Sequence, residues 1–272
     1  GTSEEYLGKA LKKNVARNQV VIASKVYFNE GRLSRQAIMR EIDGTLSRLG
    51  TDYLDLYIIH RFDYDTPIEE TMEALHDLVK AGKVRALGAS AMYGYQFYNM
   101  QLAARDNGWT PFSAMENHYN LLYREDEREL LPICKQMKVS LMPYSPLAAG
   151  HLARPQWKSE SLRGTTDRVA MGKYDKTEAE DMQIVKRVAE LAEKYNCKMS
   201  QIAIAWQWAK GILSPIIGAT KTKYLDDSAG AFDIKLTAED LAYLEEPYVP
   251  HEIVGAIDKN PAQGVILLDE KK

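Results

Sequence analysis

Short apolar runs alternate along the chain with segments whose apolar positions recur at helical spacing. Apolar runs of about four to eight residues bounded by turn residues predict buried strands. The strands that this pattern predicts lie at 20–25, 54–60, 84–89, 112–117, 139–144 and 214–218. Alternation of strands with helices along the chain predicts a parallel sheet covered by helices.

Start and stop residues frame several of the predicted helices. Ser34 can cap the N-terminus of one helix, and Gly50 can close it. Pro67 and Gly82 frame the next helix in a similar way. Ser200 is expected to open a helix of small and apolar residues.

The spacing of the strands favours a (β/α)8 barrel, because one strand follows another after about 30 residues before a long loop. An open dinucleotide-binding sheet would carry GxGxxG after its first strand, and the sequence has no such motif there. Only six of the eight strands of a barrel are recognisable, and the helix expected from Ser3 to about Lys13 would need a strand before it. We therefore interpret residues 1–272 as a single barrel domain that is incomplete at the N-terminus.

Residues 148–177 form one long stretch without helical or strand periodicity. Residues that break periodicity recur in it: Gly150, Pro155, Gly164, Thr165, Thr166 and Gly172. A loop of this length in a compact domain is usually functional or disordered. We interpret it as a loop that covers a cofactor or a substrate.

Charge and composition exclude several classes of partner. The 272 residues include 35 Lys and Arg and 38 Asp and Glu, which gives a net charge of -3 without a run of like charge. This balance argues against a nucleic-acid or membrane surface and favours a small-molecule partner. The sequence shows no signal peptide and no apolar run of about 18 residues, so we expect no membrane span.

The two cysteines are expected to be reduced. Cys134 and Cys197 lie in separate predicted helices and have no metal-ligand spacing. Isolated cysteines of this kind are typical of a cytoplasmic protein rather than of a disulfide framework. We therefore expect a cytoplasmic location.

Polar residues at the ends of the predicted strands are the candidates for chemistry, because reactive groups of parallel barrels lie where strands end and loops begin. Lys25 and His60 each end an apolar strand, where a cation or an imidazole is costly to bury unless it faces a pocket. The alternatives are a lysine whose amino group reaches solvent and a core histidine bonded to the backbone. The other residues in such positions are Ser90, Glu116, Tyr144 and Ser145, together with Gly218 to Lys221.

A lysine and a histidine together suit carbonyl chemistry. A buried lysine lowers the pKa of a neighbouring tyrosine, which can then donate a proton to a carbonyl oxygen. An imidazole can orient and polarise that oxygen. We interpret His118 as structural, and His76, His151 and His251 as solvated or core residues.

Two segments suit phosphate groups. Residues 145–150 are mostly small and end in glycine, so backbone N–H groups could approach a pyrophosphate, although a plain turn would look similar. Residues 218–221 precede a helix expected from about Lys223, as in a phosphate site at a helix N-terminus or in an ordinary loop. Tyr144 could stack on a flat cofactor or simply pack in the core.

Several segments together resemble the aldo-keto reductase superfamily, and within it a branch of bacterial and fungal reductases of sugars and small carbonyls. The matching segments are Gly1-Thr2-Ser3-Glu4-Glu5-Tyr6-Leu7-Gly8, Leu46 to Gly50 with Asp52-Tyr53-Leu54-Asp55-Leu56, Asn117-His118-Tyr119-Asn120-Leu121-Leu122-Tyr123-Arg124-Glu125, Pro143-Tyr144-Ser145-Pro146-Leu147 and Pro215-Ile216-Ile217-Gly218-Ala219. The combination is far more specific than any one segment. The resemblance implies a (β/α)8 barrel that binds NADP(H) and transfers a hydride between the nicotinamide and an aldehyde or ketone.

The resemblance also implies a role for each candidate. Lys25 matches the lysine that tunes the catalytic tyrosine, and His60 matches the histidine that orients the substrate carbonyl. Ser90 and Glu116 match residues that hold the nicotinamide carboxamide, and Tyr144 matches the aromatic residue that stacks on the nicotinamide ring. The other matches are Ser145, Leu147 and Gly150 at the pyrophosphate, Gly218 in the second phosphate loop, Thr220 and Lys221 near the 2′-phosphate, and Asp227 and Ser228 at the adenine end.

The chain departs from the family pattern in two places. The family's catalytic Asp and Tyr precede the segment that matches residues 1–5, so both are expected to be missing, with two strands and a helix. We interpret this as truncation, rather than as a smaller closed barrel or a cover from another chain. Glu116 stands where the family usually has Gln, and a carboxylate cannot donate to the carboxamide C=O. Weaker nicotinamide binding is expected from that change.

Three functions are compatible with these observations. The first is an NADP(H)-dependent aldo-keto reductase of a small carbonyl or alcohol, although the absent Asp and Tyr count against turnover by this chain alone. The second is an NADP(H)-binding redox-sensing module with little turnover. The third makes Lys25 a Schiff-base lysine in an aldolase-like barrel, which the second phosphate segment disfavours.

Overall fold

The structure is a computed structural model that describes residues 1–158, 167–255 and 257. The chain divides into two compact units, which we describe one at a time over their described residues. The first unit comprises Gly1–Met115 and Ile133–Val139, and the second comprises Glu116–Pro132 and Ser140–Asp258.

A parallel sheet forms the centre of the first unit. Four of the five strands of the sheet begin in this unit, in the order β1 (Ala23–Val26), β2 (Leu54–Ile59), β3 (Val84–Ser90) and β4 (Phe112–Glu116). Lys25 pairs with Ile58, and Ile58 pairs with Gly88, in parallel register. The carboxyl ends of the first three strands therefore lie at the same edge of the sheet, as the alternation of strands and helices predicts.

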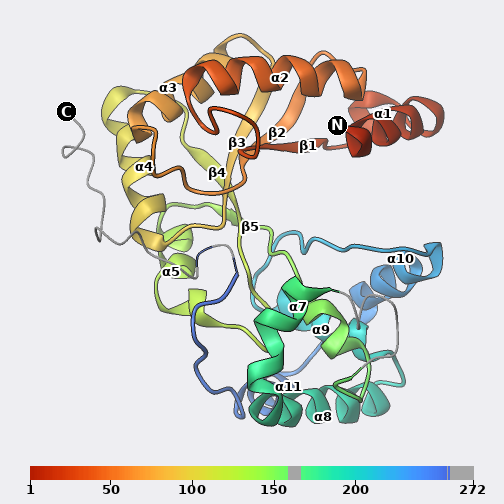
Figure 1. The fold of residues 1–272 in the computed structure, drawn as a ribbon. Helices are drawn as coiled ribbons and strands as arrows, with labels where there is room; N and C mark the ends of the chain where they lie inside the picture. Colours follow the sequence, from red (N-terminus) through yellow and green to blue (C-terminus); the bar gives the residue numbers. More distant parts are fainter. Residues whose placement is uncertain (159–166, 256, 258–272) are drawn as a thin grey trace. The chain divides into compact units, whose positions relative to one another are not determined.

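Four helices follow one another along one side of this sheet (Figure 1). They are α1 (Thr2–Asn14), α2 (Arg35–Leu49), α3 (Ile68–Lys80) and α4 (Gly94–Asn107), and the 3-10 helix η1 (Arg17–Gln19) precedes β1. The Ser34 side chain accepts a hydrogen bond from the Ala37 N–H and caps α2, which Gly50 ends at a φ of 67°. Pro67 precedes α3, and Gly82 follows it at a φ of 73°. The predicted ends of both helices are confirmed.

The two faces of the sheet carry different side chains. Ser24 of β1 donates a hydrogen bond of 2.6 Å to Glu4 of α1, so Ser24 faces the helices. Successive strand residues point to opposite faces, and Lys25 therefore lies on the other face. Its register neighbours Ile58 and Gly88 share that face.

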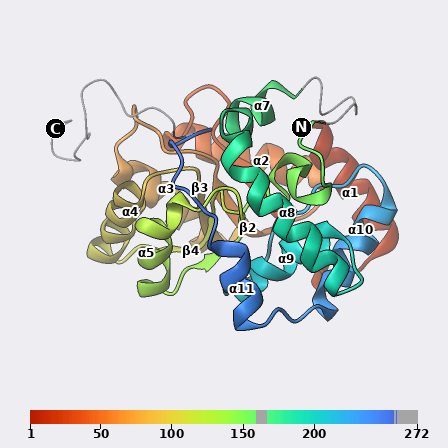
Figure 2. The same ribbon diagram turned by 90° about the horizontal axis from the view of Figure 1, so that it is seen from below.

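The second unit is mainly helical. Its elements are η2 (Glu125–Arg128), β5 (Ser140–Leu141), η3 (Ala148–Ala153), α7 (Arg168–Tyr174), η4 (Asp175–Thr177), α8 (Glu178–Lys194), α9 (Met199–Ala209), α10 (Thr222–Ala229), η5 (Gly230–Asp233) and α11 (Ala238–Glu245), and α5 (Leu130–Gln136) spans the division between the units. Helix α8 packs on α9 and α11 (Figure 2). Val188, Trp206 and Leu244 are buried in the core that these helices share.

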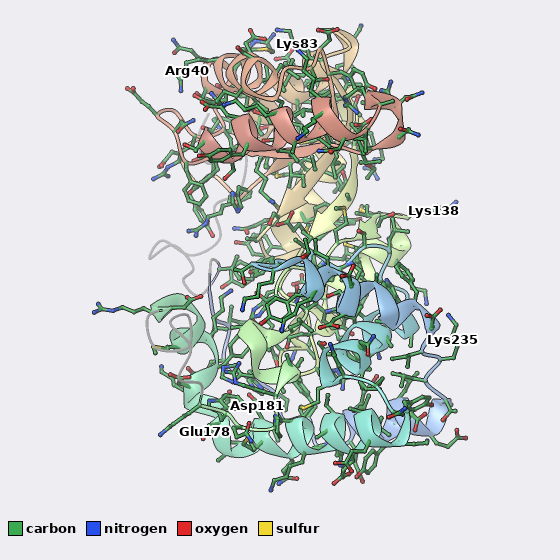
Figure 3. The ribbon with its side chains drawn as sticks, turned by 90° about the vertical axis from the view of Figure 1, so that its right-hand side faces the viewer. Arg40, Lys83, Lys138, Glu178, Asp181 and Lys235 are labelled. Carbon is green, nitrogen blue, oxygen red and sulfur yellow. The ribbon has the colours of Figure 1, made fainter. Side chains whose placement is uncertain are left out.

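A buried contact between His251 and Asp181 holds the segment after α11 against α8. His251 Nε2 lies 3.0 Å from a carboxylate oxygen of Asp181, which is labelled in Figure 3. The Thr177 hydroxyl donates to the same carboxylate at 2.6 Å. Burial by itself would lower the pKa of His251, but the hydrogen bond and the charge of Asp181 raise it above the ordinary value.

The predicted strand at 214–218 is not formed. This segment makes only isolated backbone bonds, from Ser214 to the Leu141 carbonyl (3.4 Å) and from Ile216 to the Pro143 carbonyl (2.9 Å). Pro143 has no N–H group that could donate back to the Ser214 carbonyl, so the parallel ladder between these two segments stays incomplete. The strand predicted at 139–144 is reduced to β5 for the same reason, because Pro143 interrupts it.

The stretch 148–177 is more regular than its composition predicts. It begins with η3, and α7 and η4 occupy its last part, whereas residues 159–166 lie outside the described residues. Helix α9 starts at Met199, one residue before the predicted start at Ser200. Cys197 lies in the turn before α9 instead of in a helix, and it is a free cysteine, as is Cys134 of α5.

No helix within the described ranges has both the length and the apolar character that a membrane span requires.

The close approach of α1 to α2 depends on Gly8. A Cβ atom at Gly8 would lie 2.4 Å from the backbone oxygen of Leu49, so Gly8→Ala forces the two backbones apart. We expect this substitution to lower the free energy of unfolding by about 1 to 3 kcal/mol, measured by urea denaturation followed by circular dichroism. The control is Gly172→Ala in α7, whose Cβ would meet nothing within 4 Å. Equal destabilisation by both substitutions would contradict this account of the α1–α2 contact.

Candidate active site

Three of the predicted site residues lie together in the first unit. Lys25 is in β1, His60 directly follows β2, and Ser90 ends β3. Lys25 pairs with Ile58, and the two-residue step from Ile58 to His60 keeps both on the face opposite the helices. The His60 N–H donates to the Val26 carbonyl at 3.0 Å, which fixes His60 beside the end of β1. Ser90 occupies the corresponding end of β3 and is buried.

The imidazole of His60 is neutral near pH 7. Burial, followed by the positive charges of Lys25 and Arg61, lowers the pKa of His60 to about 4. The ring of Phe28 contacts it edge to face, with 5.0 Å between the ring centroids. A neutral imidazole has one N–H donor and one nitrogen acceptor, so His60 can donate a hydrogen bond to a carbonyl oxygen without carrying a charge.

A cavity of about 210 Å³ in the second unit brings together the two predicted phosphate segments. It is lined by Ser145, Pro146, Leu147, Ala149, Gly150, Ile216, Ile217 and Gly218. Four of these belong to the predicted cofactor site: Ser145, Leu147, Gly150 and Gly218. The sequence predicts each of these segments separately as suitable for phosphate. The tertiary structure places both of them at one cavity.

The backbone of the first of these segments turns sharply. Ser145, Ala149 and Gly150 have φ angles of 58°, 55° and 99°. Residues other than glycine rarely adopt positive φ angles, because their Cβ atom crowds the backbone. Successive N–H groups in such turns can form a concave surface that binds anions. At Gly150 a Cβ atom would also lie 2.7 Å from the Arg154 guanidinium.

Tyr144 lies beside the segment that follows Glu116. Glu116 ends β4, and its side chain is buried. The Tyr144 N–H donates to the Asn117 carbonyl at 2.9 Å, and Tyr144 forms a parallel bridge with His118. The rings of Tyr144 and His118 are nearly parallel, with an angle of 7° between them.

The predicted 2′-phosphate and adenine residues lie outside the lining of this cavity. Thr220 and Lys221 are exposed, and Lys221 directly precedes α10. Asp227 forms an ion pair with Lys198. Ser228 donates its hydroxyl hydrogen to a backbone carbonyl one turn earlier in α10, at 2.8 Å.

A buried polar network beside Tyr144 was not predicted from the sequence. The Tyr174 hydroxyl lies 2.7 Å from His118 Nε2 and accepts a hydrogen bond of 3.1 Å from Asn120 Nδ2. The sequence did not single out Tyr174, because Tyr174 lies in the stretch 148–177, which shows no helical or strand periodicity. The available signal was the segment Asn117 to Asn120, whose amide and imidazole groups stand among large apolar residues.

The predicted residues thus form two groups, one in each unit. The first group is Lys25, His60 and Ser90, and the second is Glu116, Tyr144, Ser145, Leu147, Gly150, Gly218, Thr220, Lys221, Asp227 and Ser228. Within the part of the chain that the structure describes, no cluster of three or more His, Cys, Asp and Glu side chains is arranged to hold a metal ion.

The buried imidazole leads to a prediction about pH. Because the pKa of His60 is lowered, its contribution to stability is complete above pH 6.5 and decreases as the pH falls toward 4, where the folded form is protonated as well. We expect the His60 ring signals in NMR spectra to titrate near pH 4, and Lys25→Met to move that midpoint upward. The control Lys9→Met, on the exposed part of α1, should leave the midpoint unchanged. A midpoint near 6.5 in the unaltered protein would contradict the burial of this ring.

Comparison with known proteins gives a consistent result. The model of the Aldo/keto reductase family matches residues 1–248. A versiconal hemiacetal acetate reductase of Aspergillus parasiticus is 43% identical to this chain, over 93% of this chain and 81% of the relative. An aldo-keto reductase of Alternaria alternata is 40% identical, over 91% and 75%. A solved thermostable aldo-keto reductase, in complex with the inhibitor epalrestat, matches at 29% identity with a TM-score of 0.75, over 91% of this chain and 78% of that one.

These matches confirm the predicted resemblance and the predicted (β/α)8 barrel class. They also support an oxidoreductase that uses a nicotinamide cofactor, which is the general property of the family. From the family match and from the relatives that share about two fifths of its residues, we conclude that this chain belongs to the Aldo/keto reductase family.

Proposed function

We propose that this chain is an NADP(H)-dependent oxidoreductase that interconverts a small aldehyde or ketone and its alcohol. The observation that carries the proposal is the cavity between residues 145–150 and residues 216–218. Each segment by itself has an ordinary alternative as a loop. Their convergence on one cavity favours a shared ligand with phosphate groups, such as the diphosphate of a dinucleotide.

The residues around this cavity suit a phosphate group. Positive φ angles at Ser145 and Gly150 give the backbone a concave shape. At Gly218 a Cβ atom would meet nothing within 4 Å, so a ligand has room to approach the backbone there. Lys221 is exposed and would add a positive charge for the 2′-phosphate.

The residues on the first unit's sheet suit the reacting carbonyl. When bound, the nicotinamide supplies the hydride for the carbonyl carbon. His60, held neutral by burial, would donate a hydrogen bond to the carbonyl oxygen and orient it. The proton for that oxygen would come from water or from a phenol whose pKa is lowered by Lys25, which lies on the same face. Ser90 would bind the nicotinamide carboxamide. In the second unit, Glu116 suits the carboxamide and Tyr144 suits the nicotinamide ring.

Cofactor binding is the first test of the proposal. We expect NADPH to bind the chain with a dissociation constant in the micromolar range, measured from NADPH fluorescence. Lys221→Met should weaken NADPH binding by about tenfold and leave NADH binding unchanged, because NADH lacks the 2′-phosphate that a charge-assisted contact would hold. Lys223→Met is the matched control, since it removes the same charge two residues later in α10.

The proposal fails if the chain binds no NADPH at high micromolar concentration. If NADPH binds but no aldehyde in a broad panel is reduced, the chain is a cofactor-binding module rather than a reductase. Equal effects of Lys221→Met on NADPH and NADH would reject the assignment of Lys221 to the 2′-phosphate.

The carboxylate of Glu116 gives a second, independent test. An amide at this position can donate to the carboxamide C=O of the nicotinamide and accept from its N–H₂, whereas an ionised carboxylate can only accept. We expect Glu116→Gln to tighten NADPH binding several-fold, because one hydrogen bond is gained in a buried position. Adenosine 2′,5′-bisphosphate, which lacks the nicotinamide, should bind both proteins equally. Unchanged or weaker NADPH binding by Glu116→Gln would remove Glu116 from the carboxamide site.

A further inference from the structure

Three aromatic rings are stacked behind the proposed nicotinamide position in the second unit. The His118 ring lies nearly parallel to the Tyr144 ring, with 5.3 Å between their centroids. It also lies nearly parallel to the Tyr123 ring, at 4.2 Å. His118 is therefore the middle member of the stack, and its orientation affects the orientation of Tyr144.

The Tyr174 hydroxyl holds His118 from a distant part of the sequence. It lies 2.7 Å from His118 Nε2, and both residues are buried. Burial raises the pKa of Tyr174, so the hydroxyl keeps its proton near pH 7 and can donate to the ring nitrogen. Burial, with the charge of Lys173, keeps the pKa of His118 well below its ordinary value, so the imidazole is neutral and can accept.

The same hydroxyl is tied to the backbone of the phosphate-binding segment. Asn120 Nδ2 donates to the Tyr174 hydroxyl at 3.1 Å and to the Ser145 carbonyl at 2.9 Å. Asn120 Oδ1 accepts from the Leu122 N–H at 2.9 Å, which fixes the amide orientation. Ser145 has a φ of 58°, a conformation that needs support from its surroundings. One buried hydroxyl thus connects the ring stack of Tyr144 with the strained backbone at Ser145.

We propose that Tyr174 is a positioning residue for the cofactor, which sets the Tyr144 ring through His118 and the Ser145 backbone through Asn120. The inference deepens the proposed function and rests on it, because it needs Tyr144 at the nicotinamide and Ser145 at the pyrophosphate. Tyr174 itself touches neither of these ligand groups in this scheme. Its effect is to hold both binding elements in one arrangement before the cofactor arrives, which reduces the entropic cost of binding.

The test compares Tyr174→Phe with Tyr119→Phe. Both substitutions remove one buried phenol oxygen from the second unit, but the Tyr119 hydroxyl donates to Glu127 instead of to a residue of the ring stack. We expect Tyr174→Phe to raise the dissociation constant of NADPH by about five- to tenfold, because it removes the buried hydrogen bonds to His118 and Asn120. Its affinity for adenosine 2′,5′-bisphosphate should stay within about twofold of the unaltered protein, because that fragment carries neither a nicotinamide nor a diphosphate bridge. Tyr119→Phe should leave both affinities unchanged.

A second variant covers the case in which Tyr174→Phe does not fold. Asn120→Asp keeps the oxygen that accepts from Leu122 but removes the N–H₂ group that links Tyr174 to Ser145. It should again weaken NADPH binding more than binding of the bisphosphate. Thermal melting of each variant separates this effect from general loss of structure.

The outcomes distinguish this inference from the proposed function. If the unaltered protein binds no NADPH, the proposed function is wrong and the inference falls with it. If the unaltered protein binds NADPH and Tyr174→Phe binds it equally well, only the inference is overturned. Equal weakening of NADPH and bisphosphate binding would assign Tyr174 to general stability and would also overturn it.

Discussion

The cost of burying a polar side chain shapes both groups of candidate residues. A polar group taken out of water costs several kcal/mol unless a partner inside the protein replaces the lost hydrogen bonds. In the second unit, the hydroxyl of Tyr174 provides that partner for His118 and Asn120. In the first unit, His60 avoids the greater cost of a buried charge because its pKa is lowered to about 4.

The neutral His60 and the hydrogen-bonded Tyr174 network would suit different tasks in a carbonyl reductase. A neutral His60 at the end of a parallel strand could donate a hydrogen bond to a carbonyl oxygen without competing with Lys25 as a second cation. A ring stack fixed by hydrogen bonds is too rigid to follow a ligand, and it would suit a flat ring that must be held in one pose.

Local chemistry made much of the fold predictable. Ser34 and Gly50 frame α2 where their capping preferences place them, and the apolar run before His60 forms a predicted parallel strand. The strand predicted at 20–25 is shorter and lies at Ala23–Val26. Local chemistry failed where proline removed a backbone donor, as at Pro143, since an apolar run alone does not reveal whether a ladder can form. It also failed across residues 168–177, which are helical although glycine and polar residues make them look irregular.

The sequence by itself placed Lys25 and His60 within one residue of the ends of β1 and β2, because apolar runs are local properties. It also determined the family, through segments spread along the chain. Only the tertiary structure decided which distant groups meet. The cavity shared by residues 145–150 and 216–218, and the contact of Tyr174 with His118, depend on how α7 and the intervening chain pack. Packing selects such partners by shape and by the need to satisfy buried polar groups, and neither is encoded in local spacing.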